Sequence, residues 1–364
     1  MSRFPFFSCV RSTNGETEES SEKKHRYGTK GVKADQPKLL SCVANARLLE
    51  STEIIVAPDM SDPRCVLGEG TLGRVYKGIL QTGQEVAVKK MFDEEADLFK
   101  EVKMLSSVEH SNIIKMIGYC NKGKDRIIVF ELMPSRSLNL YLHDLKPGKE
   151  PLDWKTRMKI AEGVAKALEY LHDQNDPPVI YSGLKSTSIL LNENYNPKLS
   201  DFSCAIHGPE CNYVAIHSKL VRGGGYIGPE YMKTGVLTLE SDVFGFGVVL
   251  LELISGQKLV EENIRGSGKH DLTSWARPLL DDSKKFPEIA DPLMKGQYPY
   301  CELVQALDLA KMCVQPEPHK RPRIAEVVTT LSNLGSQISE EAQGTTEADP
   351  FTPLTMWRGA VAVA

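Results

Sequence analysis

The chain has 364 residues, of which 41% are hydrophobic and 25% are charged, and its net charge at pH 7 is −4. These values are ordinary for a globular protein, and the small acidic excess argues against nucleic acid as a partner. No apolar run approaches the roughly 18 residues that a membrane-spanning helix needs, and no secretory signal is recognisable at the amino terminus. The 8 cysteines include no Cys-x-x-Cys pair, so we expect reduced thiols in a cytoplasmic protein rather than disulfides or a zinc site.

Composition divides the chain into three parts. Residues 1–50 are polar and lack hydrophobic periodicity, which predicts a disordered amino-terminal arm. Residues 51–335 carry one uninterrupted globular pattern without a linker-like break, which predicts a single domain. Residues 336–364 begin with sequence rich in Ser, Glu, Gln and Thr, and this composition predicts a flexible carboxy-terminal tail.

Strand signals dominate the first part of the domain, about residues 62–133. Short alternating runs occupy the segments 74–77, 85–88, 113–119 and 126–130. A single helix is expected over 94–106, where Leu98, Val102 and Leu105 share one face. This part therefore forms a small lobe built mainly of β-strands.

Helical spacing dominates the second part, about residues 134–335. Helices are expected over 154–172, 242–254, 301–314 and 324–334. A β-rich lobe followed by an α-rich lobe is an α+β arrangement, and the cleft between two such lobes is a natural ligand site.

A glycine-rich segment begins the β-rich part, with Gly68, Gly70 and Gly73 in Gly-x-Gly-x-x-Gly spacing. A Walker A loop would need Lys and Ser or Thr after the last glycine, where Arg74 stands. A dinucleotide-binding fold would need a helix there, whereas a strand pattern begins at Val75. The remaining interpretation is a hairpin flap over nucleotide phosphates, which predicts a lysine on the next strand.

Lys89 supplies that lysine, at the end of the strand that contains Ala87. We expect its ammonium group to bind the α- and β-phosphates of ATP and to pair with Glu101 on the following helix. The adenine is expected between Ala87 and Leu190. The full set of residues predicted to bind ATP is Leu67, Gly68, Gly70, Gly73, Val75, Ala87, Lys89, Glu101 and Leu190.

Several further segments, in the same order along the chain, resemble one family. They are 110–114, 118–120, 152–161, 197–202, 241–247, 275–278, 290–292 and 320–322. Together they are similar to the plant receptor-like cytoplasmic kinases of subfamily VII, over about residues 66–334. The resemblance implies the bilobal protein-kinase fold, phosphorylation of Ser or Thr with ATP and magnesium, and work beneath membrane receptor kinases or with other signalling proteins. It also makes Asp201 the magnesium ligand.

The resemblance extends to three anchoring residues. In the family, an acidic residue at the position of Glu230 pairs with an arginine at the position of Arg321, and Asp242 anchors the catalytic loop. We expect both features here, as parts of the scaffold rather than of the chemistry.

The catalytic loop departs from the family pattern, Arg-Asp-Leu-Lys-x-x-Asn, although Lys185 is retained. Gly183 replaces the aspartate that orients the substrate hydroxyl and accepts its proton. Ser188 replaces an asparagine that helps to hold magnesium, and Ser182 replaces the arginine that binds a phosphorylated activation segment. A neutral hydroxyl on a short stem is a poorer ligand for a hard cation.

Three further departures lie outside the loop. Ser203 follows Asp201 and Phe202 where the family has glycine, Gly223 replaces a threonine of the activation segment, and Leu72 replaces an aromatic residue at the tip of the flap. The sequence therefore predicts a pseudokinase that binds ATP weakly and acts as a scaffold or regulator. The alternative is a slow serine/threonine kinase, because kinase catalysis relies mainly on positioning and charge.

Attachment to the plasma membrane is a separate expectation that concerns the arm. Ser2 follows the initiator methionine, which excludes N-myristoylation, whereas Cys9 beside Phe6 and Phe7 is a candidate for S-acylation. One acyl chain gives only marginal, reversible binding, so we predict peripheral association with a cytoplasmic pool. A Cys9→Ser variant should lose the membrane-bound fraction, with Cys42→Ser as the control. Identical fractionation of the parent and the Cys9→Ser protein would contradict acylation at Cys9.

Overall fold

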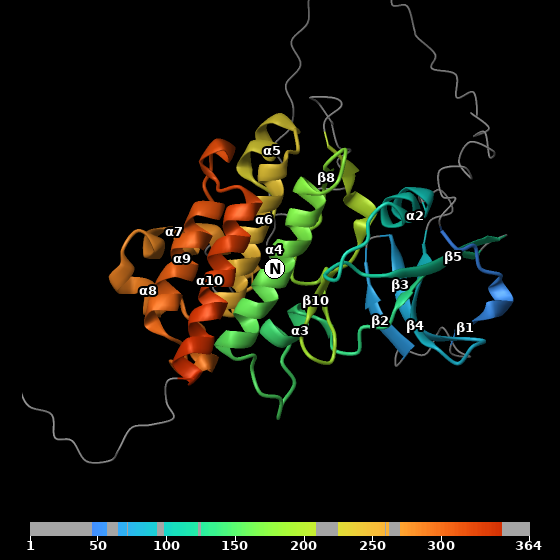
Figure 1. Ribbon diagram of the computed structural model, residues 1–364, viewed down its shortest axis with the longest axis horizontal. Coiled ribbons are helices and arrows are strands. Elements are labelled where there is room, and N and C mark those ends of the chain that lie inside the picture. The colour runs from blue at the N-terminus through green and yellow to red at the C-terminus, as the bar shows by residue number, and fades with distance from the viewer. Residues whose placement is uncertain are drawn as a thin grey trace, which may run out of the picture.

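The computed structural model describes residues 46–56, 65–70, 72–92, 98–122, 125–208, 225–258, 260–261 and 270–343. A β-rich lobe stands beside a larger helical lobe (Figure 1). The predicted α+β class is therefore confirmed, with the strands first and most of the helices later in the chain.

The smaller lobe contains an antiparallel six-stranded sheet in the order β1-β3-β4-β6-β5, with β2 paired to β3. Its elements are β1 (Ile54–Val56), β2 (Val66–Glu69), β3 (Gly73–Leu80), β4 (Glu85–Met91), helix α2 (Leu98–Ser106), β5 (Met116–Lys122) and β6 (Asp125–Glu131). In this register Lys89 of β4 lies between Val75 of β3 and Ile128 of β6.

Successive side chains of a strand point to opposite faces of a sheet. In this sheet, apolar residues pack against both faces. In β4, Val86 and Val88 join one cluster, whereas Ala87 joins the main core together with Val102 of α2. Leu49 packs on the face that carries Val86 and Val88. It is 2% exposed, and its amide donates to the carbonyl of Tyr119 at 2.8 Å. The prediction of a disordered arm through residue 50 is wrong for residues 46–50, because an apolar sheet face needs a cover.

The larger lobe contains the longer helices and several short strand pairs. Its helices are α3 (Asn139–Leu142), α4 (Trp154–Asp173), α5 (Pro229–Thr234), α6 (Leu239–Ser255), α7 (Leu272–Leu280), α8 (Phe286–Ile289), α9 (Tyr300–Cys313) and α10 (Ile324–Gln343). Its strands form the sheets β10 (Pro197–Leu199)–β9 (Ile189–Leu191)–β7 (Arg136–Ser137), β11 (Ile206–His207)–β8 (Val179–Ile180) and β12 (Val260–Glu261)–β13 (His270–Asp271).

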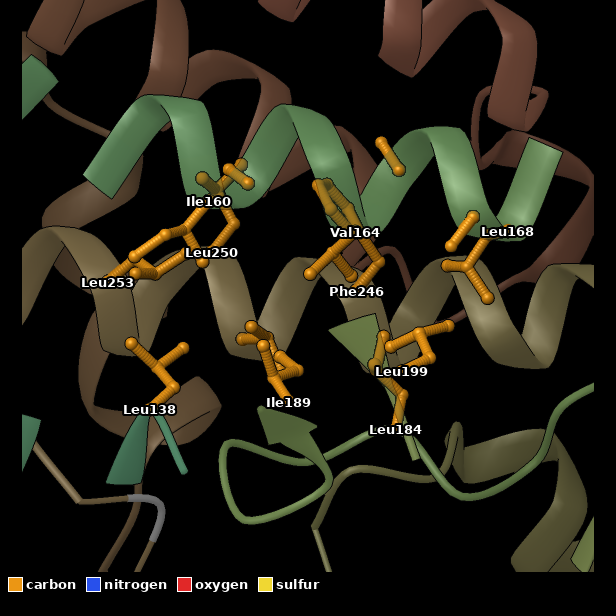
Figure 2. Packing of buried hydrophobic residues seen from close by; sticks show 14 of the residues in the cluster. Leu138, Ile160, Val164, Leu168, Leu184, Ile189, Leu199, Phe246, Leu250 and Leu253 are labelled. Atoms are coloured by element: carbon orange, nitrogen blue, oxygen red, sulfur yellow. The ribbon is translucent and has the colours of Figure 1, made fainter. Parts of the chain in front are cut away.

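The core of this lobe lies between α4 and α6. Figure 2 shows Ile160, Val164 and Leu168 of α4 facing Phe246 and Leu250 of α6. Beneath them, the same cluster includes residues of the loop and strands that border the cleft, namely Leu138, Leu184, Ile189 and Leu199. The floor of the cleft is thus fixed to the most buried part of the molecule.

Helix α6 is apolar on nearly all sides, as a helix inside a large core must be. It begins with a capping box between Thr238 and Ser241 and ends at Gly256, whose φ of 66° is left-handed. Helix α10 continues to Gln343, past residue 336, where the predicted flexible tail begins. The segment 336–343 contains neither glycine nor proline, and nothing in it ends a helix. None of the described helices is long and apolar enough to cross a membrane.

A buried ion pair joins α5 to the segment before α10. Arg321 contacts both carboxylate oxygens of Glu230, at 2.8 and 2.6 Å, and its guanidinium lies 4.9 Å from the ring centroid of Phe244. It also donates to the carbonyl oxygens of Gln315 and Glu240. Burial would raise the pKa of the Glu230 carboxyl, but hydrogen bonds and charge from Arg321 lower it instead.

Loss of this arginine should destabilise the larger lobe. Removal of one partner of a buried pair leaves the other charge uncompensated, so Arg321→Ala should lower the free energy of unfolding by about 3–5 kcal/mol. Chemical denaturation would measure the change. The control is Arg323→Ala, whose side chain is exposed; it should change stability by no more than about 0.5 kcal/mol. If Arg321→Ala changed the free energy of unfolding as little as Arg323→Ala, the ion pair would contribute nothing to stability.

Candidate nucleotide-binding site

A cleft of about 390 Å³ separates the two lobes. It is lined by all of the residues predicted to bind ATP: Leu67, Gly68, Gly70, Gly73, Val75, Ala87, Lys89, Glu101 and Leu190. Lys185, Ser188 and Asp201 also line it. The chain thus brings together residues that lie more than a hundred positions apart in the sequence.

One end of the cleft is apolar. Leu67, Val75 and Ala87 lie on strands β2, β3 and β4 of the smaller lobe, and Leu190 lies on β9 of the larger lobe. Two apolar walls from opposite lobes form a slot that suits a flat heteroaromatic ring, as ligand pockets commonly do.

The glycine-rich flap forms the hairpin between β2 and β3. The amide of Gly70 donates to the carbonyl of Gly73 at 2.9 Å, which closes the turn. A Cβ atom at Gly73 would lie 2.5 Å from the carbonyl oxygen of Lys90, so only glycine allows β4 to approach this closely. Gly68 also lines the cleft, but a Cβ atom there would have no neighbour within 4 Å, so packing does not require glycine at this position.

Charged groups occupy the other end. The ammonium of Lys89 lies 2.7 Å from Glu101 Oε2 and 3.3 Å from Asp201 Oδ1. Burial would lower the pKa of Lys89, but the negative charges of Glu101 and Asp201 outweigh it and raise that pKa above its ordinary value. Lys89 is therefore a permanent cation at the place where phosphates would lie.

The Asp201 carboxylate contacts two further side chains besides Lys89. The ammonium of Lys185 lies 3.8 Å from Oδ2, and the hydroxyl of Ser203 donates to Oδ1 at 2.8 Å. Burial would raise the pKa of the Asp201 carboxyl, but Lys89 and Lys185 lower it, so the carboxylate is ionised. The side chain of Ser203, which the sequence leaves without a role, thus holds the predicted metal ligand.

The catalytic loop is anchored from below by Asp242 of α6. Its carboxylate accepts the amides of Tyr181 and Ser182, both at 2.7 Å, and contacts His172 Nε2 at 2.9 Å. His172 is therefore a buried packing residue that contacts the anchoring carboxylate. Ser182 Oγ donates to the carbonyl of Cys204 at 2.6 Å and so links the loop to the residues that follow the Asp201–Ser203 turn.

The loop has space for a carboxylate but does not carry one. A Cβ atom at Gly183 would meet nothing closer than the Asp201 carbonyl oxygen at 3.6 Å, and the Gly183 backbone is not left-handed. Ser188 is 1% exposed, and its hydroxyl lies 3.1 Å from the Gly183 carbonyl and 2.9 Å from that of Lys185. The Ser188 hydroxyl therefore hydrogen-bonds to the backbone of its own loop.

The residues present fit magnesium in part. Magnesium commonly binds one or two carboxylates together with substrate phosphates and water. Asp201 can supply one carboxylate, whereas Gly183 supplies none and the Ser188 hydroxyl is engaged by the backbone. No cluster of three His, Cys, Asp or Glu side chains suited to a metal occurs in the described part of the chain.

Two contributors to the site were not singled out from the sequence. Tyr181, fully buried, donates its hydroxyl to the Ser200 carbonyl and packs against Phe202 with ring centroids 5.1 Å apart. Arg136 lines the cleft from β7. Neither belongs to a spacing pattern that would reveal it. Cys9 and Gly223 lie outside the described residues.

Comparison with known proteins identifies the class to which this fold and cleft belong. Residues 63–331 match the protein kinase domain, and the chain therefore belongs to the protein kinase family.

Among relatives, the chain is 51% identical over 290 residues to serine/threonine-protein kinase PBL27 of Arabidopsis thaliana. It is 48% identical over 290 residues to serine/threonine-protein kinase PBS1 of the same plant. Each match covers 78% of this chain, and the chain spans 56% of PBL27 and 63% of PBS1. It is thus homologous to the receptor-like cytoplasmic kinases of subfamily VII.

Proposed function

We propose that this chain is a pseudokinase that binds ATP weakly and acts as a scaffold or regulator in signalling. One observation carries the proposal: the residues that would hold phosphates are assembled, whereas those that would move a proton are missing. Lys89 contacts both Glu101 and Asp201. The loop position beside them, Gly183, has room for a side chain and lacks one.

The lost groups account for a large part of kinase catalysis. A positioned general base contributes roughly 10²–10⁴-fold in rate. Loss of a metal ligand at Ser188 adds a second penalty, because the metal ions neutralise charge that develops on the transferred phosphoryl group. These factors multiply, which supports inactivity over slow turnover.

The same losses favour a nucleotide that binds with little help from magnesium. The phosphate end contains two cations, Lys89 and Lys185, and two anions, Glu101 and Asp201. An aspartate at position 183 would add a third anion, whose repulsion of a triphosphate a metal would have to neutralise. Without it, Lys89 and Lys185 can meet the phosphates directly.

A slow serine/threonine kinase remains the second candidate. It is favoured by the contact between Lys185 and Asp201, because Lys185 is a charged residue of the catalytic loop that lines the cleft at the phosphate end. Positioning and charge alone supply much of the acceleration in phosphoryl transfer.

We further propose that the partners are membrane receptor kinases or other signalling proteins, and that the chain works in the cytoplasm and peripherally at the plasma membrane. The support is homology to PBL27 and PBS1 together with Cys9 in the amino-terminal arm. The proposal includes no nucleic acid.

Nucleotide binding should depend on Lys89. Lys89→Ala should weaken ATP binding by roughly 10–100-fold, because hydrogen bonds to charged groups are typically worth about 1.5–3 kcal/mol. Isothermal titration calorimetry with and without magnesium would measure this, and the parent should lose little affinity without the metal. Lys90→Ala, on the same strand, is the control. Unchanged ATP affinity in Lys89→Ala would refute the role of Lys89.

Phosphotransfer should be absent from the parent chain. Incorporation of labelled phosphate into the chain or a generic substrate should not exceed that of Asp201→Asn. The double variant Gly183→Asp with Ser188→Asn should recover partial activity, and neither single reversion should recover much, since such residues act as a unit.

Thermal unfolding of each reversion variant would show that it folds. Robust incorporation by the parent, abolished in Asp201→Asn, would refute the pseudokinase proposal and support the slow kinase.

A further inference from the structure

Arg136 has an unusual backbone for its residue type. It follows Pro134 and Ser135 in the segment that connects the two lobes, and its φ is 63°. Left-handed backbone is unfavourable for a residue with a Cβ atom, and such strain persists where the surrounding contacts hold it. The amide of Arg136 donates to the Met133 carbonyl at 3.0 Å, and β7 pairs Arg136 with Leu191 of β9.

The side chain of Arg136 extends from the larger lobe to the smaller one. Its Nη2 atom donates to the carbonyl of Leu67 and lies 3.4 Å from that of Val66, both on β2. Strand β2 leads directly into the glycine-rich flap, whereas β7 belongs to the sheet that carries Leu190. The guanidinium of Arg136 therefore connects β2, on the smaller-lobe wall of the cleft, to β7, on the larger-lobe wall.

The guanidinium is also incompletely satisfied. Its Nε atom is buried and has no hydrogen-bond partner within the described part of the chain. A buried donor without an acceptor costs free energy, more so in a charged group. The contact with β2 therefore leaves one donor of the guanidinium unsatisfied. This cost lowers the free energy that is needed to break the contact.

We propose that Arg136 is a latch across the nucleotide cleft that limits how fast a nucleotide enters and leaves. In the free protein the latch ties β2 to β7 beside Leu67 and Leu190, the residues expected to enclose the base. A nucleotide can pass only while the guanidinium is released. This inference rests on the proposed binding of ATP and adds control of its exchange.

The informative substitution is Arg136→Gly, because glycine removes the latch and relieves the left-handed strain together, so the turn should not unfold. The matched control is Lys295→Gly. Lys295 also has a positive φ, 52°, and caps η6 (Pro292–Met294) instead of lining the cleft. It reproduces the relief of strain without touching the proposed latch.

The first measurement is hydrogen exchange in the nucleotide-free protein. Amides of Val66–Glu69 should exchange faster in Arg136→Gly than in the parent, and at the parental rate in Lys295→Gly. Unchanged exchange in Arg136→Gly would overturn the latch whether or not the protein binds nucleotide.

The second measurement is stopped-flow binding of a fluorescent N-methylanthraniloyl derivative of ATP. Association and dissociation rates should both rise roughly tenfold in Arg136→Gly, since hydrogen bonds to a charged donor must break in the parent. Faster exchange of β2 amides with unchanged nucleotide rates would reduce Arg136 to a structural tie and overturn the proposal. Binding by Arg136→Gly but not by the parent would support it.

If neither protein binds the nucleotide, the proposed function fails together with any control of exchange by Arg136. The amide-exchange result would then show separately whether Arg136 ties β2 to β7. The two failures are thus distinguishable.

Discussion

The carboxylate of Asp242 is the contact on which the arrangement of the cleft depends. It lies on the buried helix α6 and accepts the amides of Tyr181 and Ser182, at the start of the catalytic loop. Buried carboxylates are stable when several donors satisfy them, and His172 provides a third contact. Because α6 packs on all sides in the core, the loop inherits the rigidity of the most buried helix (Figure 2).

This anchoring explains how the loop keeps its shape without its catalytic side chains. Backbone amides of the loop bind Asp242, and the hydroxyl of Ser188 binds loop carbonyls, so neither interaction needs an aspartate at position 183. The shape of the loop therefore does not depend on the side chain at position 183. The described structure retains that shape, and with it the contact of Lys89 with Glu101 and Asp201.

Features that depend on local periodicity or on fixed spacing could be predicted from the sequence. The pairing of Lys89 with Glu101 followed from a flap, the next strand and a helix face that contains Val102 and Leu105. The pairing of Glu230 with Arg321 followed from family resemblance alone, because 91 positions separate the two residues.

Features set by tertiary contact could not be predicted. The burial of Leu49 requires knowledge that one face of the sheet would otherwise be bare. The bond from Ser203 to Asp201 and the reach of Arg136 to Leu67 depend on rotamers and on the distance between lobes. Neither quantity has a signature in residue order.

The hydrogen bond from Ser182 to the Cys204 carbonyl bears on whether this part of the chain needs a phosphate to be held in place. An arginine at position 182 would need an anionic partner, such as a phosphate, to be satisfied. The serine hydroxyl is neutral and already has its acceptor, and β11 pairs with β8 immediately afterwards. A neutral bond of this kind is not screened by salt and does not respond to added charge. The first residues after the Asp201–Ser203 turn are therefore joined to the catalytic loop by a contact that contains no phosphate, so dephosphorylation cannot break it.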